Sequence, residues 1–297
     1  MKAPDTVRVE LEPPLDVPGS LAALGRWGDD GLDRWDGTGF LRTLRDGDRV
    51  VPFAGWPGGS VDAPWVDVAS AKADLPRTTE VVRAMFVAAP SALADLSRHD
   101  PAIARLDAAY PGIRPVLHRD PLTALIRSIS AQQVNLTWAT EIRRRLALAY
   151  GTEHAVGGET VRSLDAERLA AATIDDLRTI QLTNAKARSV IAVARAALDG
   201  QLRLADLERL DDEAVAARLV ALPGIGPWSA DWFLARTLGR PRVAAGDLGV
   251  RKAVGRAYLE GRLPSESEVR ALTAHWGAAA GVAQQLILQD LVAGAPA

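Results

Sequence analysis

The spacing of apolar residues changes along the chain, and near residue 75 a two-residue period gives way to a helical one. Strict alternation of apolar and charged side chains, as in residues 7–12, predicts strands with one buried face. The predicted strands lie at 7–12, at both ends of 40–53 and at 65–68. The two strands within 40–53 are joined by Asp46-Gly47, a favoured hairpin turn. Residues 1–75 are therefore predicted to form a small N-terminal domain with an antiparallel sheet.

From about Thr78 onward, apolar residues recur three and four positions apart, which predicts amphipathic helices. The clearest predicted helices span 122–134, 137–149, 174–182, 185–198, 212–222, 227–238, 248–258 and 283–291. A further short helix, with Ser20 as its N-cap, is expected inside the N-terminal part. The predicted fold class is α+β, with residues 76–297 forming an all-helical region.

The composition excludes several kinds of chemistry. The 297 residues suffice for two ordinary domains. The chain has no cysteine, which excludes disulfides, thiolate metal sites, iron-sulfur clusters and cysteine nucleophiles. Its four histidines are scattered, without metal-ligand spacing. The chain also begins without an apolar signal core and contains no long apolar run, so a cytoplasmic protein is expected.

Charge is unevenly distributed along the sequence. The formal net charge is -2, which argues against a generally basic, nucleic-acid-binding surface. Between Ala221 and Arg256, however, arginine and lysine clearly outnumber aspartate and glutamate. A local basic patch is enough to engage phosphates, so this segment is a candidate nucleic-acid contact.

A glycine-containing turn separates the helices predicted for 212–222 and 227–238. Gly224 and Gly226 permit a tight helix-to-helix hairpin, and Pro227 suits the first position of the second helix. Unpaired amides at the start of that helix could bind a phosphate. An ordinary helical hairpin without a ligand would satisfy the same spacing.

A carboxylate follows this hairpin at a suggestive distance. Asp247 lies 21 residues after Gly226, at the expected start of the helix 248–258. Leu-Pro-Gly-Ile-Gly-Pro-Trp-Ser-Ala at 222–230, followed by Asp247, resembles the helix-hairpin-helix (HhH-GPD) DNA glycosylases, and is most similar to the bacterial alkylbase (3-methyladenine) branch. The resemblance implies that Asp247 is catalytic and that the active-site cleft lies between two helical lobes. Asp247 could also be only an N-cap, because aspartate is favoured there.

The resemblance also implies a reaction type. A carboxylate beside C1′ stabilises the positive charge that develops on the sugar as the base leaves, and it could orient or deprotonate the attacking water. Members that also cleave the DNA backbone carry a lysine where this chain has Trp228, so a monofunctional enzyme is expected. Trp228 could then stack on the extruded base, and Trp232, one turn later, could extend the base pocket. Both tryptophans could instead be core residues.

Other site residues are implied by the same resemblance. Gln133 matches the side chain that enters the duplex where the base has left, and Gln132 is expected to line the base pocket. The remaining expected DNA contacts are Leu222, Gly224, Ile225, Gly226, Ser229 and Arg251. Backbone carbonyls of Val220, Leu222 and Ile225 are expected to hold a structural monovalent cation, and no other cofactor is required.

Residues 10–16 resemble the opening of the sheet domain of the alkylbase glycosylases, so the resemblance spans nearly the whole chain. Two departures affect the expected base pocket. Trp276 is followed by glycine and alanine instead of the family's proline and arginine, and Leu288 replaces an aromatic residue. Both departures bear on which bases the pocket prefers.

The leading hypothesis is a monomeric, nucleoid-associated glycosylase that flips alkylated bases such as 3-methyladenine out of duplex DNA and leaves an abasic site. The same fold could act instead on hypoxanthine, uracil or an oxidised purine. Two other classes remain open: a non-catalytic protein that binds damaged DNA, and a helical protein without a nucleic-acid partner, which the slightly negative net charge favours.

Overall fold

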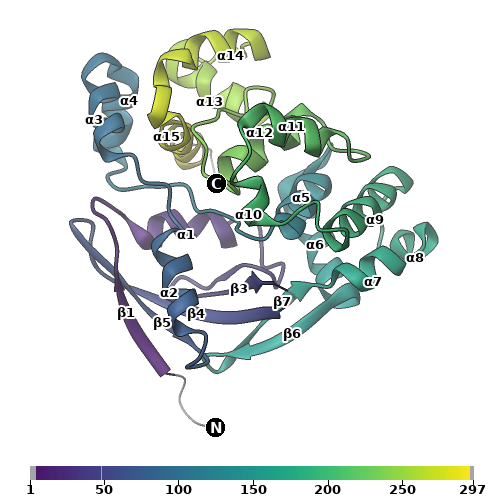
Figure 1. The fold of residues 1–297 in the computed structure, drawn as a ribbon. Helices are drawn as coiled ribbons and strands as arrows, with labels where there is room; N and C mark the ends of the chain where they lie inside the picture. The colour runs from purple at the N-terminus through teal and green to yellow at the C-terminus, as the bar shows by residue number, and fades with distance from the viewer. Residues whose placement is uncertain (1–4, 48, 295–297) are drawn as a thin grey trace.

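A five-stranded antiparallel sheet forms the N-terminal part of the molecule (Figure 1). The computed structural model describes residues 5–47 and 49–294. The strands are β1 (Asp5–Glu10), β2 (Arg34–Trp35), β3 (Phe40–Asp46), β4 (Arg49–Ser60) and β5 (Ala63–Ser70), in the order β1-β5-β4-β3-β2. Pairing of β3 with β4 ends at Asp46 opposite Arg49, and Gly47 has a φ of 60°. The predicted sheet and its hairpin are thus confirmed.

One face of this sheet is apolar and is covered by α1 (Val17–Gly25) and α2 (Leu75–Arg83). The prediction that Ser20 caps the first helix is wrong. Asp16 is the N-cap, because its carboxylate accepts a hydrogen bond from the Gly19 amide and so satisfies the start of the helix. Ser20 is buried inside α1, where its hydroxyl accepts a hydrogen bond from the Arg114 amide.

The rest of the described chain is mainly helical, as expected. The helices are α3 (Pro90–His99), α4 (Pro101–Ala109), α5 (Pro121–Ala131), α6 (Leu136–Tyr150), α7 (Ala166–Ala171), α8 (Ile174–Thr179), α9 (Asn184–Leu198), α10 (Leu204–Leu207), α11 (Asp212–Val220), α12 (Pro227–Arg236), α13 (Leu248–Tyr258), α14 (Glu266–Thr273), the 3-10 helix η1 (Ala274–Ala279) and α15 (Ala280–Ala293). Among the described residues, none of these helices is long and apolar enough to cross a membrane.

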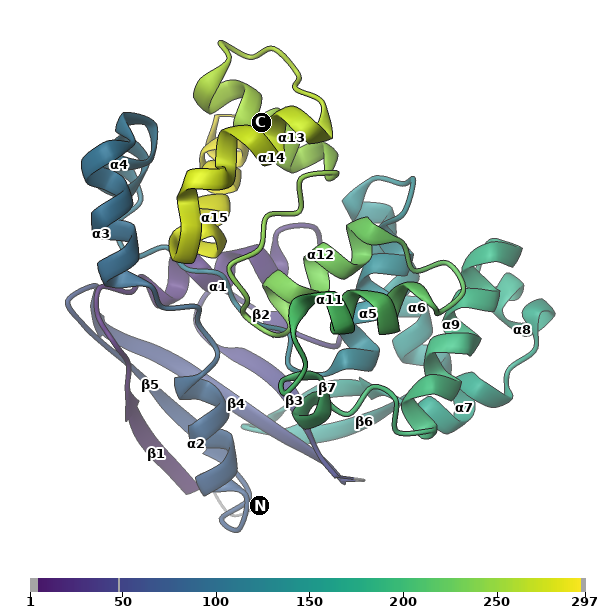
Figure 2. The ribbon, with the colours of Figure 1, turned by 45° about the horizontal axis from the view of Figure 1, so that its top comes forward.

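The helices pack around two separate apolar cores, which Figure 2 shows as two groups above the sheet. The first core lies among α5 to α12 and includes Leu125 and Phe233. The second lies among α3, α4, α13, η1 and α15, around the buried Trp276. The chain passes from the first group to the second in the segment between α12 and α13, and Asp247, directly before α13, accepts hydrogen bonds from Trp228 and Trp232 of α12.

One segment contradicts the prediction that residues 76–297 are all helical. Strands β6 (Gly151–Val156) and β7 (Glu159–Leu164) form a hairpin between α6 and α7. Gly157 and Gly158 both have positive φ at its turn. Val156 and Val161 pack against Leu41 and Ala54 of the N-terminal sheet. The hairpin therefore joins the helical part of the chain to the sheet.

A buried network of charges makes a second connection between the sheet and the helices. Asp30 binds Arg127 of α5 at 3.0 Å and Arg143 of α6 at 2.7 Å. Asp33 binds Arg127 at 2.8 Å and Arg42 of β3 at 2.6 Å. All of these side chains are at most 17% exposed. Because the network is buried, each charge depends on its partners for stabilisation.

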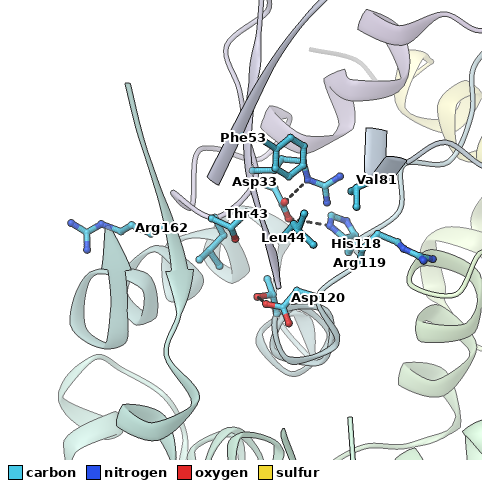
Figure 3. Close-up of a pocket in the computed structure, with 12 residues that line it drawn as sticks. Asp33, Thr43, Leu44, Phe53, Val81, His118, Arg119, Asp120 and Arg162 are labelled. Carbon is cyan, nitrogen blue, oxygen red and sulfur yellow. Dashed lines mark hydrogen bonds and ion pairs between the residues drawn. The ribbon is translucent and has the colours of Figure 1, made fainter. Parts of the chain in front are cut away.

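His118 completes the network beside a small cavity (Figure 3). Its Nδ1 lies 3.1 Å from Asp33 Oδ2, and burial lowers the pKa of His118 to about 4 despite this carboxylate. The neighbouring arginines hold the pKa of Asp33 well below its usual value. The cavity lies between the sheet and the start of α5, and it includes none of the site residues predicted from the sequence.

We predict that Asp30→Asn lowers the free energy of unfolding by about 3 to 5 kcal/mol, because Arg127 and Arg143 lose a buried anionic partner. Denaturant unfolding measures this loss. Asp67→Asn is the matched control, since Asp67 pairs with Arg8 on the surface, and it should cost only a small fraction as much. Equal losses in the two variants would contradict a stabilising role for the buried network.

Candidate active site

The expected helical hairpin is formed by α11 and α12, with residues 221–226 as its turn. Gly224 has a φ of 78°, and a Cβ at this position would lie 1.9 Å from the Ser189 hydroxyl of α9. Gly226 has extended backbone, with open space where a Cβ would point. Only Gly224 is therefore required by conformation and close packing.

The turn presents hydrogen-bond donors that the described part of the chain does not use. The amides of Gly224 and Gly226 have no acceptor among the described residues, and both glycines are accessible. Pro227 begins α12, so the first helical position has no amide hydrogen. Accessible unpaired amides beside a helix N-terminus are suited to a phosphate oxygen.

Asp247 lies against two tryptophans of α12. It is the N-cap of α13, and its Oδ1 accepts a hydrogen bond from the Val250 amide at 3.0 Å. Its Oδ2 accepts hydrogen bonds from Trp228 Nε1 at 2.8 Å and Trp232 Nε1 at 3.2 Å. These donors stabilise negative charge on the carboxylate and fix its orientation. Asp247 is also partly accessible, so it can contact a ligand.

The structure therefore brings together Asp247, Trp228 and Trp232, which the sequence separates by up to 19 positions. Both tryptophans are half-buried, and Trp232 also packs against the second apolar core. Their indole nitrogens are occupied by the carboxylate, which leaves the ring faces for other contacts. Stacking of a base on Trp228 stays a prediction.

The glutamine pair lies in a loop that contacts the hairpin. The helix predicted for 122–134 ends earlier, since α5 stops at Ala131 and Gln132 has extended backbone. Gln132 Nε2 donates to the Gly224 carbonyl at 2.8 Å. Gln133 follows with a φ of 55°, a left-handed conformation that is uncommon outside glycine, and its side chain is exposed. This exposed position is compatible with entry of the Gln133 side chain into the duplex, which stays a prediction.

The buried charge network extends to this loop. Arg143, which binds Asp30, also donates to the Ser130 hydroxyl at 3.2 Å. Lys186 of α9 donates to the Ser130 carbonyl at 2.9 Å. The end of α5 is thus held by two cations, and the position of the glutamine loop depends on both.

The structure bears on two of the predicted DNA contacts, Ser229 and Arg251. Ser229 is 0% exposed and its hydroxyl is buried, so the predicted contact of this residue with DNA finds no support in the structure. Arg251 donates from Nε to the Pro264 carbonyl at 2.7 Å, which commits part of its guanidinium to the protein. Leu222, Gly224, Ile225 and Gly226 do lie in the turn, although the Ile225 side chain is buried.

Part of the positive charge predicted for residues 221–256 is paired with carboxylates in the folded protein. Arg242 pairs with Asp231 at 2.8 Å, and Arg256 pairs with Asp290 at 2.9 Å. Asp290 lies outside this segment, so the composition of residues 221–256 did not show that the charge of Arg256 is neutralised. Much of the expected patch is therefore neutralised within the protein.

A monovalent cation needs neutral oxygen ligands that are free to bind it. The predicted ligands are the backbone carbonyls of Val220, Leu222 and Ile225. The Leu222 carbonyl accepts the Ile225 amide at 3.1 Å, while the other two carbonyls have no backbone donor in residues 5–47 and 49–294. Neutral oxygens without donors fit a cation of low charge. No cluster of three or more histidine, aspartate or glutamate side chains suited to a metal occurs in the same described ranges.

Sequence reasoning missed Arg236 and Gln285, which connect Trp232 to α15. Arg236 lies one turn further along α12, with its guanidinium carbon 5.3 Å from the Trp232 ring centroid. Its Nη2 donates to Gln285 Oε1 of α15 at 2.5 Å. Leu288 of α15 lies beside Gly249, at the start of α13. The four-residue spacing of Trp232 and Arg236 was the available signal.

We predict that Gly224→Ala disrupts the hairpin, because the added Cβ meets the Ser189 hydroxyl and the residue must keep a positive φ. The expected result is a fall of about 1 to 3 kcal/mol in the free energy of unfolding, measured with denaturant. Gly226→Ala is the matched control, since its Cβ would point into open space. A larger loss for Gly226→Ala would show that the turn geometry is wrong.

Solved structures of known proteins share the fold of this chain. A solved 3-methyladenine DNA glycosylase from Archaeoglobus fulgidus superposes with a TM-score of 0.83 at 21% identity, covering 98% of this chain and 100% of the other. An 8-oxoguanine glycosylase/lyase from Clostridium acetobutylicum, solved with DNA, gives 0.71 at 17% identity, covering 94% and 92%. At such identities these structures establish the shared fold alone.

Sequence comparison extends the similarity to the site. A DNA-3-methyladenine glycosylase of Bacillus subtilis is 26% identical over 184 residues, which is 61% of each chain. The chain spans about three-fifths of the length of the first curated relatives it matches. The model of the HhH-GPD superfamily base excision DNA repair proteins matches residues 126–278, a range that includes the glutamine loop, the hairpin and Asp247. The chain therefore belongs to the HhH-GPD superfamily of base excision DNA repair proteins.

Proposed function

We propose that the protein is a DNA glycosylase that releases alkylated bases such as 3-methyladenine from duplex DNA. The observation that carries this proposal is the Asp247 carboxylate, partly accessible and held by Trp228 and Trp232 beside a hairpin with unpaired amides. The similarity to a DNA-3-methyladenine glycosylase of Bacillus subtilis supports the substrate class.

DNA would be held mainly through its backbone. The amides of Gly224 and Gly226 donate to a phosphate, and a monovalent cation on the nearby carbonyls would add positive charge next to the same phosphate. A target base must leave the stack before it can reach Asp247, at a cost of a few kcal/mol. Gln133, exposed on the loop that Gln132 ties to Gly224, would fill the gap and offset part of that cost.

The chemistry follows from the position of one negative charge. As the bond between C1′ and the base nitrogen breaks, the base keeps the electron pair and the sugar becomes positive. Asp247 stabilises that charge, while the oxygen of a water molecule bonds to C1′ and loses a proton. An alkylated base that carries positive charge departs as a neutral molecule, so its release needs little further assistance.

We further propose that the enzyme is monofunctional. A backbone-cleaving mechanism needs an amine that can form a Schiff base with the sugar. Trp228 takes the position at which such members carry lysine, and Lys186 is held by the Ser130 carbonyl. The similarity to an 8-oxoguanine glycosylase/lyase is one of fold, and it does not supply that amine here.

Asp247→Asn should reduce release of methylated bases by about 100-fold or more, because the substitution removes charge and keeps shape. Asparagine is also a good N-cap, so α13 should be retained, while its NH2 group would take the place of Oδ2 and leave the indole N–H groups of Trp228 and Trp232 without their acceptor. Binding of lesion-containing duplex through the hairpin should be retained. Base release from methylated duplex, measured without added metal or nucleotide, tests this. Asp67→Asn serves as the control for a surface charge change. An Asp247→Asn protein with wild-type release would remove this residue from the mechanism.

Borohydride trapping should yield no covalent protein–DNA complex, because no lysine occupies the position of Trp228. The abasic product should also stay intact until it is treated with alkali. A glycosylase/lyase assayed in parallel provides the positive control. A trapped complex formed by this chain would contradict the monofunctional mechanism.

A further inference from the structure

A buried turn carries Asp247 directly before α13. The turn spans residues 244–247 and is closed by a hydrogen bond of 2.9 Å from the Asp247 amide to the Ala244 carbonyl. Ala244 and Ala245 are both 0% exposed and belong to the second apolar core. The accessible carboxylate of Asp247 therefore extends from a backbone whose position is set inside that core.

One side chain of α15 binds this turn from within the core. Gln284 is 0% exposed, and its Oε1 accepts the Ala244 amide at 2.7 Å. The carbonyl of the same alanine accepts the Asp247 amide. A chain of two hydrogen bonds thus connects the side chain of Gln284 to the backbone of Asp247. The two helices that begin beside these residues, α13 and α15, pack against each other (Figure 2).

The other contact of this segment acts at a greater distance from Asp247. Arg242, two residues before the turn, pairs with Asp231 of α12 at 2.8 Å, and its side chain is 36% exposed. A long, partly exposed side chain constrains the backbone that carries it only weakly. Among the described side chains, that of Gln284 is the one that forms a hydrogen bond to the backbone of residues 244–247.

The amide of Gln284 adds little to stability. Its oxygen satisfies the buried amide of Ala244, but its own Nε2 is buried and has no acceptor in residues 5–47 and 49–294. A buried donor without a partner costs about as much as a satisfied one contributes. The position that this amide imposes on the turn therefore explains its presence better than stability does.

We propose that Gln284 is a positioning residue that keeps the Asp247 carboxylate in register with the indole nitrogens of Trp228 and Trp232. The effect on base release rests on the proposed function. Asp247 Oδ2 accepts these two donors at 2.8 and 3.2 Å, so a small movement of the turn would break the longer bond. It would also move the negative charge away from C1′, and a misplacement of about 1 Å is enough to slow a reaction severely.

The first test observes the indole N–H signals of Trp228 and Trp232 by proton–nitrogen NMR on the full chain, with Trp228→Phe and Trp232→Phe to assign them. Gln284→Met keeps the length of the side chain and removes the oxygen that binds Ala244, so both signals should shift. Gln284→Glu keeps an oxygen acceptor in either protonation state, so both signals should stay close to their wild-type positions.

The second test compares base release with stability. In single turnovers at saturating enzyme, Gln284→Met should release 7-methylguanine about 10- to 100-fold more slowly than the wild type. Its Kd for a duplex with an uncleavable abasic analogue should change by no more than about twofold, because the hairpin amides are untouched. Gln284→Glu places an acidic group in an apolar core, so it should be the less stable variant in denaturant and yet keep most of the release rate.

Thr273→Val is the matched control for loss of a buried hydrogen bond. The Thr273 hydroxyl is buried and donates to the Val269 carbonyl at 2.8 Å, within α14 and away from the turn. This variant should leave both indole signals and the release rate unchanged. Gln284→Leu, which also lacks the oxygen, replaces Gln284→Met if the methionine variant does not fold.

Three results would overturn the inference. One is a Gln284→Met protein whose indole signals stay at their wild-type positions. Another is a shift of these signals without slower release, since the placement of Asp247 would then not matter for the reaction. The last is release that falls in parallel with stability in both Gln284 variants, as a purely structural role requires. A wild-type protein that releases no alkylated base would instead overturn the proposed function, while the indole signals would still decide whether Gln284 positions Asp247.

Discussion

The buried ion pairs of Asp30 and Asp33 are the interaction on which the arrangement of the molecule depends. Both carboxylates belong to the segment that leads from α1 into β2, and they bind arginines of α5 and α6. Arg143 then reaches the Ser130 hydroxyl, at the end of α5. One set of charges therefore holds the sheet against the helices and also supports the loop beside the hairpin. A buried network of this kind tolerates few arrangements, because each charge is costly without its partners.

The parts of the fold that follow from local chemistry were predictable. Alternation and helical spacing identified the sheet and most helices, and the Asp46-Gly47 turn was recognisable from two residues. The hairpin β6–β7 was missed because its alternation is short and it interrupts a long helical pattern. The first helix was placed too late because Ser20 and Asp16 are both acceptable N-caps, and only the packed structure distinguishes them.

Some residues of the candidate site could be predicted from the sequence and others could not. The hairpin and Asp247 could be found from motif spacing, and the structure placed Trp228 and Trp232 on the same carboxylate. The burial of Ser229 could not be found, because sequence spacing does not report which face of a helix start is covered. The partner of Arg236 lies 49 residues away on another helix, and no local pattern relates such positions.

Asp247 caps α13 and, in the proposed mechanism, would also act on the sugar, two tasks with different chemical requirements. Capping α13 requires only an oxygen that accepts the Val250 amide, whereas acting on a sugar requires a negative charge at the other oxygen. The helix does not depend on that charge for its start, although its dipole favours it. In evolutionary terms, the fold exerts little selection of its own for a charged residue at this position. In the proposed mechanism, a descendant that recognises damage without repairing it would differ from the enzyme by a single amino-acid replacement at Asp247.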